Sequence, residues 1–518
     1  MTSAAVTQTA PPQGGGVPLP RAARDRPTPR LREPMPTDRL IGWLAPLLVT
    51  AVAGLLRFWR LGEPRAFVFD ETYYAKDAHA LLRFGIEQAF TTDANERILA
   101  GDLEVFTGEP AFIAHPPAGK WVIALGEGVF GVTPLGWRVA VAVLGTLSVL
   151  MLARIGRRLF RSTLLGCAAG LLFALDGLHF VHSRTALLDP ILMVFALAAF
   201  GCLLLDRDAA RSRLAAGRSP GLRPWRLLAG LCLGLAAGTK WSGIFFVAAF
   251  GLLTVAWDYG ARKAAGTRRP VWVALLRDAP LAFVAIVGGA LASYLASWTG
   301  WFRSDDGWGR RWAEENPDGA PVPAALRSLW HYHAEMWRFN TGLDDFHPYA
   351  SNPWSWPLLG RPVSFFYEGP KLGEAGCTVE SCSRAVTALG TPALWWAGLA
   401  AVLVTAVCWL GRRDWRAGAI VAGVVAGYLP WLAFQGRTVY SFYAIAYLPW
   451  VVLALTYCLG LVLGPAATSA RRRTWGAGLA GAYVLLVAMN FFWLYPVLAA
   501  QVVPYPEWAA RMWFGSWI

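Results

Sequence analysis

Apolar segments long enough to cross a membrane follow one another along most of this chain, and the first is 41–59 (IGWLAPLLVTAVAGLLRFW). The hydrocarbon core of a bilayer is about 30 Å thick, so a helix needs about 20 predominantly apolar residues to cross it. The other clear segments are 135–153, 163–181, 186–205, 280–298, 391–410, 417–434, 442–464 and 475–497. This pattern predicts an all-α polytopic membrane protein.

Basic residues decide how the ambiguous region 227–257 is threaded, because Lys and Arg beside membrane spans accumulate on the cytoplasmic side. Region 227–257 is long for one span, short for two, and interrupted by the sequence GTKWSG. The basic clusters lie in 21–39, 154–161, 207–226, 262–277, 412–416 and 471–473. Both ends of 227–257 are therefore cytoplasmic, and we expect two short helices that turn at Lys240. An even number of crossings must separate two cytoplasmic clusters, and this predicts that 121–133 does not cross the membrane. The total is about eleven spans, with the N-terminus cytoplasmic and the C-terminus external.

The composition agrees with a membrane protein and removes two other classes. Of 518 residues, 56% are hydrophobic and only 15% are charged, whereas soluble proteins contain about 25% charged residues. The formal charge of +14 could suggest a nucleic-acid binder. However, the six basic segments with their edges hold 27 Lys and Arg against 8 Asp and Glu, and the rest of the chain holds 20 against 25. The positive charge thus indicates orientation and lipid head-group contact, not nucleic acid.

The chain divides into a tail and a membrane domain. Residues 1–40 are rich in Pro, Gly and Arg without apolar periodicity, which predicts a disordered cytoplasmic tail. Residues 41–518 form the transmembrane domain. Segment 41–59 is too long for the apolar part of a signal peptide and lacks a small-residue cleavage site after it.

Two external segments are long, 60–134 and 299–390, and both are rich in aromatic residues. We expect helices lying on the membrane surface together with ordered loops. The second segment lacks a regular strand pattern and contains Cys377 and Cys382. These two cysteines could form a disulfide, because the external side is oxidising.

The most informative motif is FDETYY, which follows the first span and contains Asp70 and Glu71. Adjacent carboxylates among aromatic residues at a membrane surface are costly to desolvate, which favours a functional role. An Asp held within hydrogen-bond reach can accept the proton of an attacking hydroxyl. The structural alternative is a helix N-cap followed by an acid in the first turn.

A second motif is HPPAGKW, with His115 and Lys120, followed by Arg138 near the external end of the next span. An unpaired cation in an apolar segment is expensive. A lipid phosphate is a natural counter-ion for Arg138, and a structural carboxylate is the alternative. Lys120 beside Trp121 is also typical of an interfacial anchor.

A third set occupies the external turn after the third span, where His179, His182, Arg184 and Asp189 lie close in sequence. The two histidines could share a helical face and bind a metal, but no third ligand is nearby. An ion pair between Arg184 and Asp189 is the structural alternative. Lys240 at the tip of the short helix pair faces the same side.

A fourth set, HPYASNPWSWPLL with Asn352 and Trp354, is followed by Arg437. Trp, Tyr and Asn in one loop are typical of a sugar-stacking surface, although interfacial aromatic belts share this composition. All these polar residues are expected on the external side, which favours a single external active site. A transporter would place polar groups through the middle of several spans.

The ordered set FDETYY, HPPAGKW, HSRTALLDP, GTKWSG and HPYASNPWSWPLL resembles the protein O-mannosyltransferases. These are integral-membrane glycosyltransferases of the GT-C class. The resemblance runs from about residue 41 to the C-terminus, and the composition suggests the actinobacterial branch. It implies a GT-C fold with external juxtamembrane helices in a bacterial plasma membrane. The β-trefoil module that eukaryotic members carry in the loop corresponding to 299–390 is expected to be absent.

The resemblance also implies the reaction, which is transfer of mannose from polyprenyl-phosphate-mannose to Ser or Thr hydroxyls of exported proteins, with inversion at the anomeric carbon. The family's roles assign the general base to Asp70, and Glu71 would position the acceptor or the base. Arg138 would bind the lipid phosphate, with Lys240, Arg437 and His115 as further ligands for the donor. Weaker assignments to substrate binding are Arg184, Asp189, Asn352 and Trp354.

No cofactor is expected, because a phosphodiester leaving group carries no pyrophosphate and a fixed Arg can stabilise its charge. The acid pair could still hold a cation, as in some related enzymes. The secretion channel is a candidate partner, since the acceptors are exported. The alternatives are another GT-C transferase with a glycan or lipid acceptor, or a lipid or sugar transporter.

Overall fold

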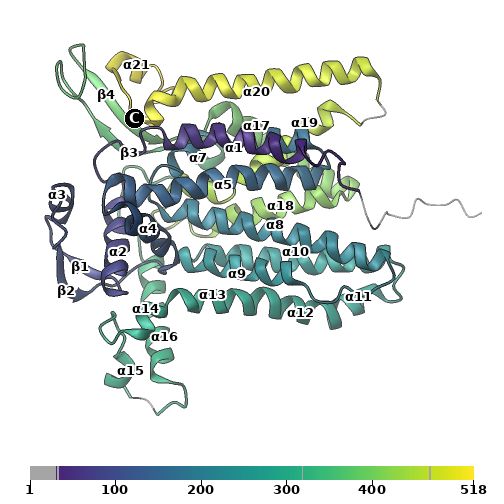
Figure 1. The fold of residues 1–518 in the computed structure, drawn as a ribbon, viewed down its shortest axis with the longest axis horizontal. Helices are drawn as coiled ribbons and strands as arrows, with labels where there is room; N and C mark the ends of the chain where they lie inside the picture. The colour runs from purple at the N-terminus through teal and green to yellow at the C-terminus, as the bar shows by residue number, and fades with distance from the viewer. Residues whose placement is uncertain (1–30, 32–33, 318, 466–467) are drawn as a thin grey trace, which may run out of the picture.

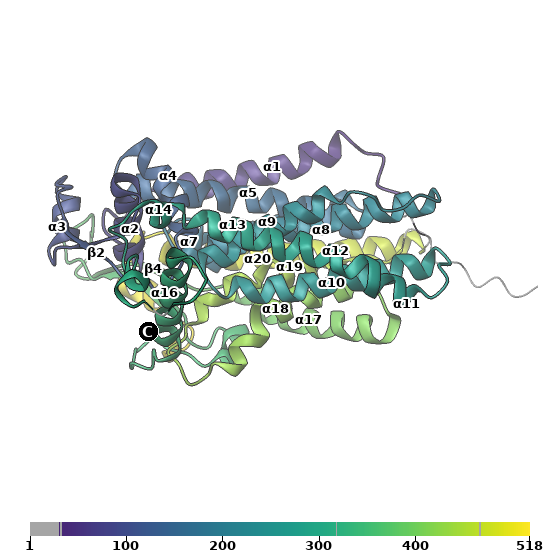
Figure 2. The same cartoon turned by 90° about the horizontal axis from the view of Figure 1, so that it is seen from below.

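Long helices run side by side along the long axis of the molecule (Figures 1 and 2). The computed structural model describes residues 31, 34–317, 319–465 and 468–518. Most of the predicted tail, residues 1–30 and 32–33, lies outside the described residues. The part next to the first helix is held in place by an ion pair of 2.7 Å between Asp38 and Arg157.

Within the described residues, eight helical segments are long and apolar enough to cross a membrane. They are α1 (Ile41–Phe58), α5 (Pro134–Phe160), α8 (Leu188–Ala215), α10 (Gly243–Ala264), Pro270–Ser297, α17 (Pro392–Arg412), Trp415–Ala433 and α20 (Ala470–Leu498). Pro270–Ser297 comprises α11 (Pro270–Val273), η1 (Ala274–Asp278), α12 (Ala279–Phe283), η2 (Val284–Gly288) and α13 (Gly289–Ser297). Trp415–Ala433 comprises α18 (Trp415–Tyr428) and η4 (Leu429–Ala433).

Three shorter helices occupy the remaining expected spans, namely α6 (Thr163–Ala174), α9 (Pro224–Thr239) and α19 (Leu448–Leu463). Each expected span therefore coincides with a helix, and the expected count of eleven crossings stays a prediction. The expected break in 227–257 is confirmed, since α9 ends at Thr239 and α10 begins at Gly243.

One expected span is interrupted in the structure. The segment 163–181 is divided into α6 and α7 (Gly177–His182) at Asp176. The Asp176 carboxylate caps α7 by accepting a hydrogen bond of 2.9 Å from the backbone N–H of His179. This cap favours a new helix start over continuation of α6. Likewise, 442–464 begins with a 3-10 turn, η5 (Ser441–Ala446), before α19.

Small residues allow α9 to lie directly against α13. A Cβ added to Gly234 would collide with the carbonyl oxygen of Ala290 and with Ser293 Oγ. Close packing through small residues is the usual way in which membrane helices associate. This packing holds α9 in place and thereby positions Lys240, the residue that directly follows α9.

The two long segments that are predicted to be external gather at one end of the bundle, where the C-terminus also lies, whereas α1 starts at the opposite end (Figures 1 and 2). The first segment contains α2 (Glu71–Phe84), β1 (Gln88–Phe90), α3 (Ala94–Leu99), β2 (Phe106–Pro110) and α4 (Ala118–Phe130). β1 and β2 pair in antiparallel fashion, with Gln88 opposite Pro110.

The second segment contains α14 (Thr299–Arg303), α15 (Trp312–Glu315), α16 (Ala324–Thr341), η3 (Pro353–Leu358), β3 (Val363–Glu368) and β4 (Cys382–Ala388). The expectation that it lacks regular strands is wrong. β3 and β4 form an antiparallel sheet with the C-terminal strand β5 (Val502–Pro504), which is followed by α21 (Tyr505–Ala509) and η6 (Gly515–Trp517). A partner strand more than 100 residues away leaves no local signal. Cys377 and Cys382 form a disulfide beside this sheet.

Candidate active site

Asp70 directly precedes α2, and its side chain does not cap the helix. The expected structural alternative, an N-cap, is therefore not the arrangement in the structure. The preceding residue, Phe69, has a φ of 52°, a left-handed conformation that is costly for a bulky side chain. Its ring stacks on Phe365 at 4.7 Å between centroids. The strained turn leaves the Asp70 carboxylate free for another task.

The surroundings of Asp70 suit proton transfer near neutral pH. Burial raises the pKa of its carboxyl from 3.8 to about 6, and nearby Asp189 acts in the same direction. The Lys240 ammonium and the Tyr74 hydroxyl act against this rise in pKa. A base is most effective when its pKa lies near the working pH. No cation lies within ion-pair distance of Asp70 among the described residues.

Glu71 is not placed for proton transfer, because its carboxylate binds Arg138. Arg138 Nε and Nη2 each donate a hydrogen bond of 2.8 Å to the two oxygens of the Glu71 carboxylate. The same carboxylate accepts hydrogen bonds of 2.9 Å from the backbone N–H groups of Val68 and Ala186. Glu71 is 0% and Arg138 is 1% exposed. This is a buried bidentate ion pair that fixes the turn before α2.

The geometry corrects the roles expected for this pair. Arg138 also donates to the carbonyl oxygens of residues 61, 64 and 66, so the guanidinium is fully engaged with protein oxygens. It has no donor left for a lipid phosphate, and the structural carboxylate partner prevails. Glu71 likewise has both oxygens occupied, which favours a structural role over contact with an acceptor.

A second ion pair joins the short helix break to α8. Lys240 Nζ donates to both oxygens of Asp189, at 3.0 and 2.9 Å. The same ammonium lies 4.2 Å from the centre of the Tyr443 ring. Asp189 thus pairs with Lys240 and not with Arg184, the partner considered from the sequence.

A cavity of about 250 Å³ opens next to this pair. Its walls include His115 and Lys240, Trp337 and Asn340 from α16, and Arg437. Arg437 is half-buried, and its Nε has no hydrogen-bond partner in the structure. Among the described residues no carboxylate lies within ion-pair distance of its guanidinium. An unpaired cation lining a cavity is suited to bind an anionic group.

The titratable groups beside the cavity influence one another. Burial lowers the pKa of His115 well below its usual value, and Lys240, Lys120 and Arg437 add to this effect. His115 is therefore neutral near pH 7. Burial also raises the pKa of Tyr440 to about 12, with Asp70 as a further cause and Arg437 acting against it. Asp70 and Arg437 thus act on the same residue from one region.

Comparison with known proteins identifies the family. The sequence model described as "Dolichyl-phosphate-mannose-protein mannosyltransferase" matches residues 47–299. A second, described as "C-terminal four TMM region of protein-O-mannosyltransferase", matches residues 325–517. A polyprenol-phosphate-mannose–protein mannosyltransferase from Mycolicibacterium smegmatis (strain ATCC 700084 / mc(2)155) is 40% identical over 93% of this chain and 94% of its own. The chain belongs to the protein O-mannosyltransferase family.

Other relatives and solved structures agree with this assignment. A polyprenol-phosphate-mannose–protein mannosyltransferase from Mycobacterium tuberculosis (strain ATCC 25618 / H37Rv) is 38% identical over 93% of both chains. The fold is similar to the Saccharomyces cerevisiae protein O-mannosyltransferase Pmt1-Pmt2 complex bound to the sugar donor. The TM-score is 0.71 at 14% identity, covering 92% of this chain and 93% of that chain. The predicted GT-C fold and mannosyltransferase class are confirmed.

Three other predicted site residues of this mannosyltransferase lie outside the cavity wall. Arg184 donates to the carbonyl oxygens of residues 56, 57, 59 and 60, so it caps the C-terminal end of α1. Asn352 accepts a hydrogen bond from the backbone N–H of Trp354 and donates one to Gln435. The Trp354 side chain is 62% exposed. Asn352 and Trp354 therefore remain candidates for a peripheral acceptor surface.

The histidine pair has local structural partners. Arg57 Nη2 donates to His179 Nδ1 at 2.7 Å, and Ser148 Oγ lies 3.0 Å from His179 Nε2. His182 Nδ1 lies 2.9 Å from the Leu178 carbonyl oxygen. Across the described ranges, no group of three or more His, Cys, Asp and Glu side chains is arranged to hold a metal ion.

Sequence reasoning missed three residues of the site. Tyr74 lies in the first turn of α2, four positions after Asp70, a spacing that could have indicated contact. Burial raises the pKa of Tyr74 well above its usual value, and Asp70 and Asp189 are among the further causes. Trp337 and Asn340 come from α16, whose amphipathic sequence has no feature that links it to the motifs. Only the fold brings this helix to the cavity.

Proposed function

We propose that the protein transfers mannose from polyprenyl-phosphate-mannose to Ser or Thr hydroxyls of exported proteins on the external face of the bacterial plasma membrane. The observation that carries the proposal is the buried Asp70 carboxylate, which has no ion-pair partner among the described residues and interacts electrostatically with Lys240 in the wall of the cavity that Arg437 also lines. In this orientation the N-terminus is cytoplasmic, and the C-terminus lies with the active site outside. The positive charge of the opposite end supports that orientation.

The chemistry requires a base on one side of the sugar and a cation on the other. The acceptor hydroxyl oxygen forms a bond to the anomeric carbon while its proton passes to Asp70. The bond from that carbon to the phosphate oxygen breaks on the opposite face, so the configuration inverts. The departing polyprenyl phosphate carries the negative charge, which Arg437 stabilises. A carboxyl whose pKa is raised to about 6 is deprotonated, and able to accept the proton, at pH 7.

The remaining residues position the donor. Asp189 holds the Lys240 ammonium over the Tyr443 ring, which places a second cation at the cavity wall. Neutral His115 can donate or accept a hydrogen bond to a sugar hydroxyl. We infer that the reaction needs no metal, because the unpaired Arg437 guanidinium can provide the charge stabilisation that the phosphate needs.

Exported acceptors would reach this end as unfolded segments, and the secretion channel is therefore proposed as a neighbour. Crosslinking from a photoreactive residue at Trp354, on the exposed loop, tests this association. Channel subunits are expected among the products, and their absence under conditions that capture acceptor protein would contradict it.

The deciding experiment measures transfer of labelled mannose to a Ser/Thr-rich peptide by the purified protein in lipid vesicles. Asp70→Asn is expected to lower the rate by about 10²–10⁴-fold with an unchanged elution profile. Asp305→Asn, which removes an exposed carboxylate from the same side, is the matched control and is expected to keep full rate. Addition of a chelator should change neither rate.

Two outcomes would overturn the proposal. Label found only in lipid or glycan would assign the protein to a transferase with another acceptor. Full transfer by Asp70→Asn would show that Asp70 is not the general base. Rates that fall with chelator and recover with a divalent ion would overturn metal independence while leaving the acceptor assignment intact.

A further inference from the structure

A cavity of about 1400 Å³ is bounded by turns and helix ends that lie at the end of the bundle opposite α2 (Figure 1). It is bounded by the turn from α5 to α6, the turn from α17 to α18, and the adjoining ends of α19 and α20. Ligand cavities in proteins usually measure about 300–1,000 Å³, so this one has room for more than a single small anion. None of the mannosyl-transfer chemistry uses it.

The polar part of the wall is strongly basic. Six arginines line the cavity, and Asp414 is the single carboxylate among its lining residues. The arginines are Arg161, Arg412, Arg413, Arg416, Arg472 and Arg473. Arg161 pairs with Asp208, and Arg416 pairs with Asp414.

Asp414 is fully engaged and does not neutralise the other arginines. Its Oδ1 accepts the backbone N–H and Nε of Arg416, and its Oδ2 accepts the Tyr457 hydroxyl at 3.1 Å. In the described part of the chain, no carboxylate lies within ion-pair distance of Arg412, Arg413, Arg472 or Arg473. Four guanidinium groups around one cavity are therefore uncompensated.

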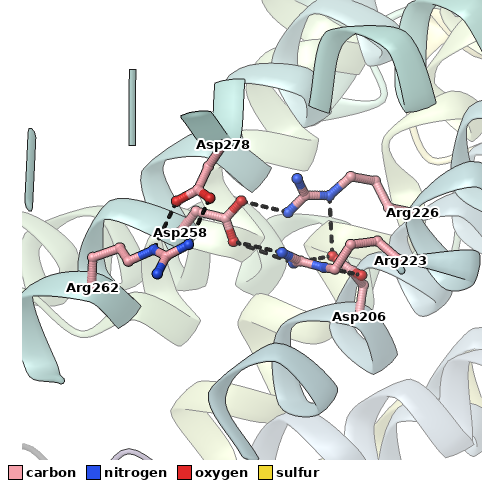
Figure 3. Close-up of polar contacts among 6 residues, drawn as sticks. All are labelled: Asp206, Arg223, Arg226, Asp258, Arg262 and Asp278. Carbon is pink, nitrogen blue, oxygen red and sulfur yellow. Dashed lines mark hydrogen bonds and ion pairs between the residues drawn. The ribbon is translucent and has the colours of Figure 1, made fainter. Parts of the chain in front are cut away.

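Other arginines at this end show what a purely structural arrangement looks like (Figure 3). Arg223 and Arg226 each bind both Asp206 and Asp258. Arg262 binds Asp278 in bidentate fashion, at 3.0 and 2.8 Å. Three cations thus meet three carboxylates among α8, α9, α10 and η1. Arg412, Arg413, Arg472 and Arg473 differ from this network, because they are exposed and no carboxylate in the described part of the chain pairs with them.

Apolar side chains form another part of the wall. Leu164 and Leu461 line the cavity and are 67% and 37% exposed. An exposed leucine beside an unpaired arginine suits a ligand with an acyl chain and an anionic head. Basic pockets between membrane helices on the cytoplasmic side are suited to bind phospholipid head groups.

We propose that this cavity is a binding site for an anionic phospholipid with two phosphodiester groups, of the cardiolipin class. Four unpaired guanidinium groups match two phosphates, each bound by two arginines. The acyl chains then lie along Leu164 and Leu461. That this end faces the anionic cytoplasmic leaflet rests on the orientation given under Proposed function.

Lipid binding to the full-length, delipidated protein tests the proposal, with native mass spectrometry as the readout. The probes are cardiolipin, phosphatidylglycerol, phosphatidylcholine and a polyprenyl phosphate. The test variant is Arg412→Gln/Arg472→Gln/Arg473→Gln. The matched control, Lys263→Gln/Arg268→Gln/Arg269→Gln, removes three exposed cations at the same end but outside the cavity.

Each arginine beside an anionic head group contributes about fivefold, so the test variant should bind cardiolipin about 100-fold more weakly. The control should change affinity by less than about threefold. Mannosyl transfer in detergent should be unchanged in both variants, which shows that they are folded and separates this result from failure of the proposed function.

Four results would overturn the proposal. Equal losses in the two variants would show diffuse charge attraction. Equal binding of phosphatidylcholine, which has no net charge, would show that the cavity does not recognise an anionic head group. Preference for the polyprenyl phosphate would assign the cavity to the carrier lipid, and competition by millimolar inorganic phosphate would assign it to a free anion.

Discussion

Glu71→Gln provides the sharpest test of how the two adjacent acids divide their tasks. The Glu71 carboxylate accepts four hydrogen bonds, two from Arg138 and one each from the backbone of Val68 and Ala186. A glutamine side chain keeps the shape but replaces one acceptor oxygen with a donor that faces other donors. It also leaves the Arg138 guanidinium as an uncompensated charge in a site where it is 1% exposed.

The expected loss of stability is large. Breaking a buried ion pair by removing one partner costs about 3–5 kcal/mol. Removing both charges, in Glu71→Gln/Arg138→Gln, should cost less than the sum of the two single variants. The coupling free energy should be about 0.5–3 kcal/mol, as for other residues in direct contact. Unfolding in mixed micelles with increasing dodecyl sulfate, followed by tryptophan fluorescence, measures these differences.

Asp70→Asn is the comparison that makes the result decisive. It should unfold at the same dodecyl sulfate concentration as the native sequence and lose turnover. Glu71→Gln should unfold earlier, while the molecules that remain folded retain a substantial transfer rate. The reasoning is refuted if Glu71→Gln unfolds normally and loses turnover as completely as Asp70→Asn, because Glu71 would then act in the reaction.

Three further predictions concern single groups. The transfer rate should fall as the pH drops through about 6, because Asp70 must be deprotonated to accept a proton. At pH 5 the rate should be about tenfold below its value at high pH. His115→Gln should leave this pH profile unchanged, and a profile that changes with His115 would contradict the assignment. Arg437→Gln should raise the KM for the donor or lower kcat, with a combined effect of about 10–150-fold on kcat/KM, whereas Arg65→Gln, which is exposed on the same side, should have none. Glu127→Leu should keep or raise the unfolding midpoint, because both carboxyl oxygens of Glu127 are buried without a hydrogen-bond partner; a midpoint well below that of the native sequence would show that a partner is bound there.

The sequence predicts the membrane helices well because hydropathy is a local property. Every expected span coincides with a helix, and even the turn at Lys240 follows from the charges that flank 227–257. The break at Asp176 was missed because one acid in an apolar segment does not reveal that it caps a helix. The sheet of β3, β4 and β5 was missed because its strands are brought together from distant parts of the chain.

The candidate site shows the same limit more clearly. The motifs come together at the end of the molecule where Asp70 lies, and the roles assigned to their residues stay predictions. They did not reveal that Arg138 binds Glu71, 67 positions away, or that Arg184 caps α1. A cation in an apolar segment calls for a partner, but its identity depends on which side chains the fold brings within reach. Arg437, a minor candidate by sequence, is the phosphate ligand proposed here because Arg138 is already occupied by Glu71 and backbone carbonyl oxygens.

The pairing of charges around the candidate site explains why Asp70 and Arg437 stand out. Glu71 binds Arg138, Asp189 binds Lys240, and Lys120 binds Asp77 and Glu87. Each of these pairs is buried, and each is satisfied because an unpaired buried charge costs several kcal/mol. Asp70 and Arg437 have opposite charges, and both alter the pKa of Tyr440 and of Tyr443, yet no ion pair joins them among the described residues. A fold under selection for stability alone would bring them together. Held apart, they would leave a carboxylate for the attacking hydroxyl and a guanidinium for the departing phosphate, which is the separation that the proposed inverting displacement requires.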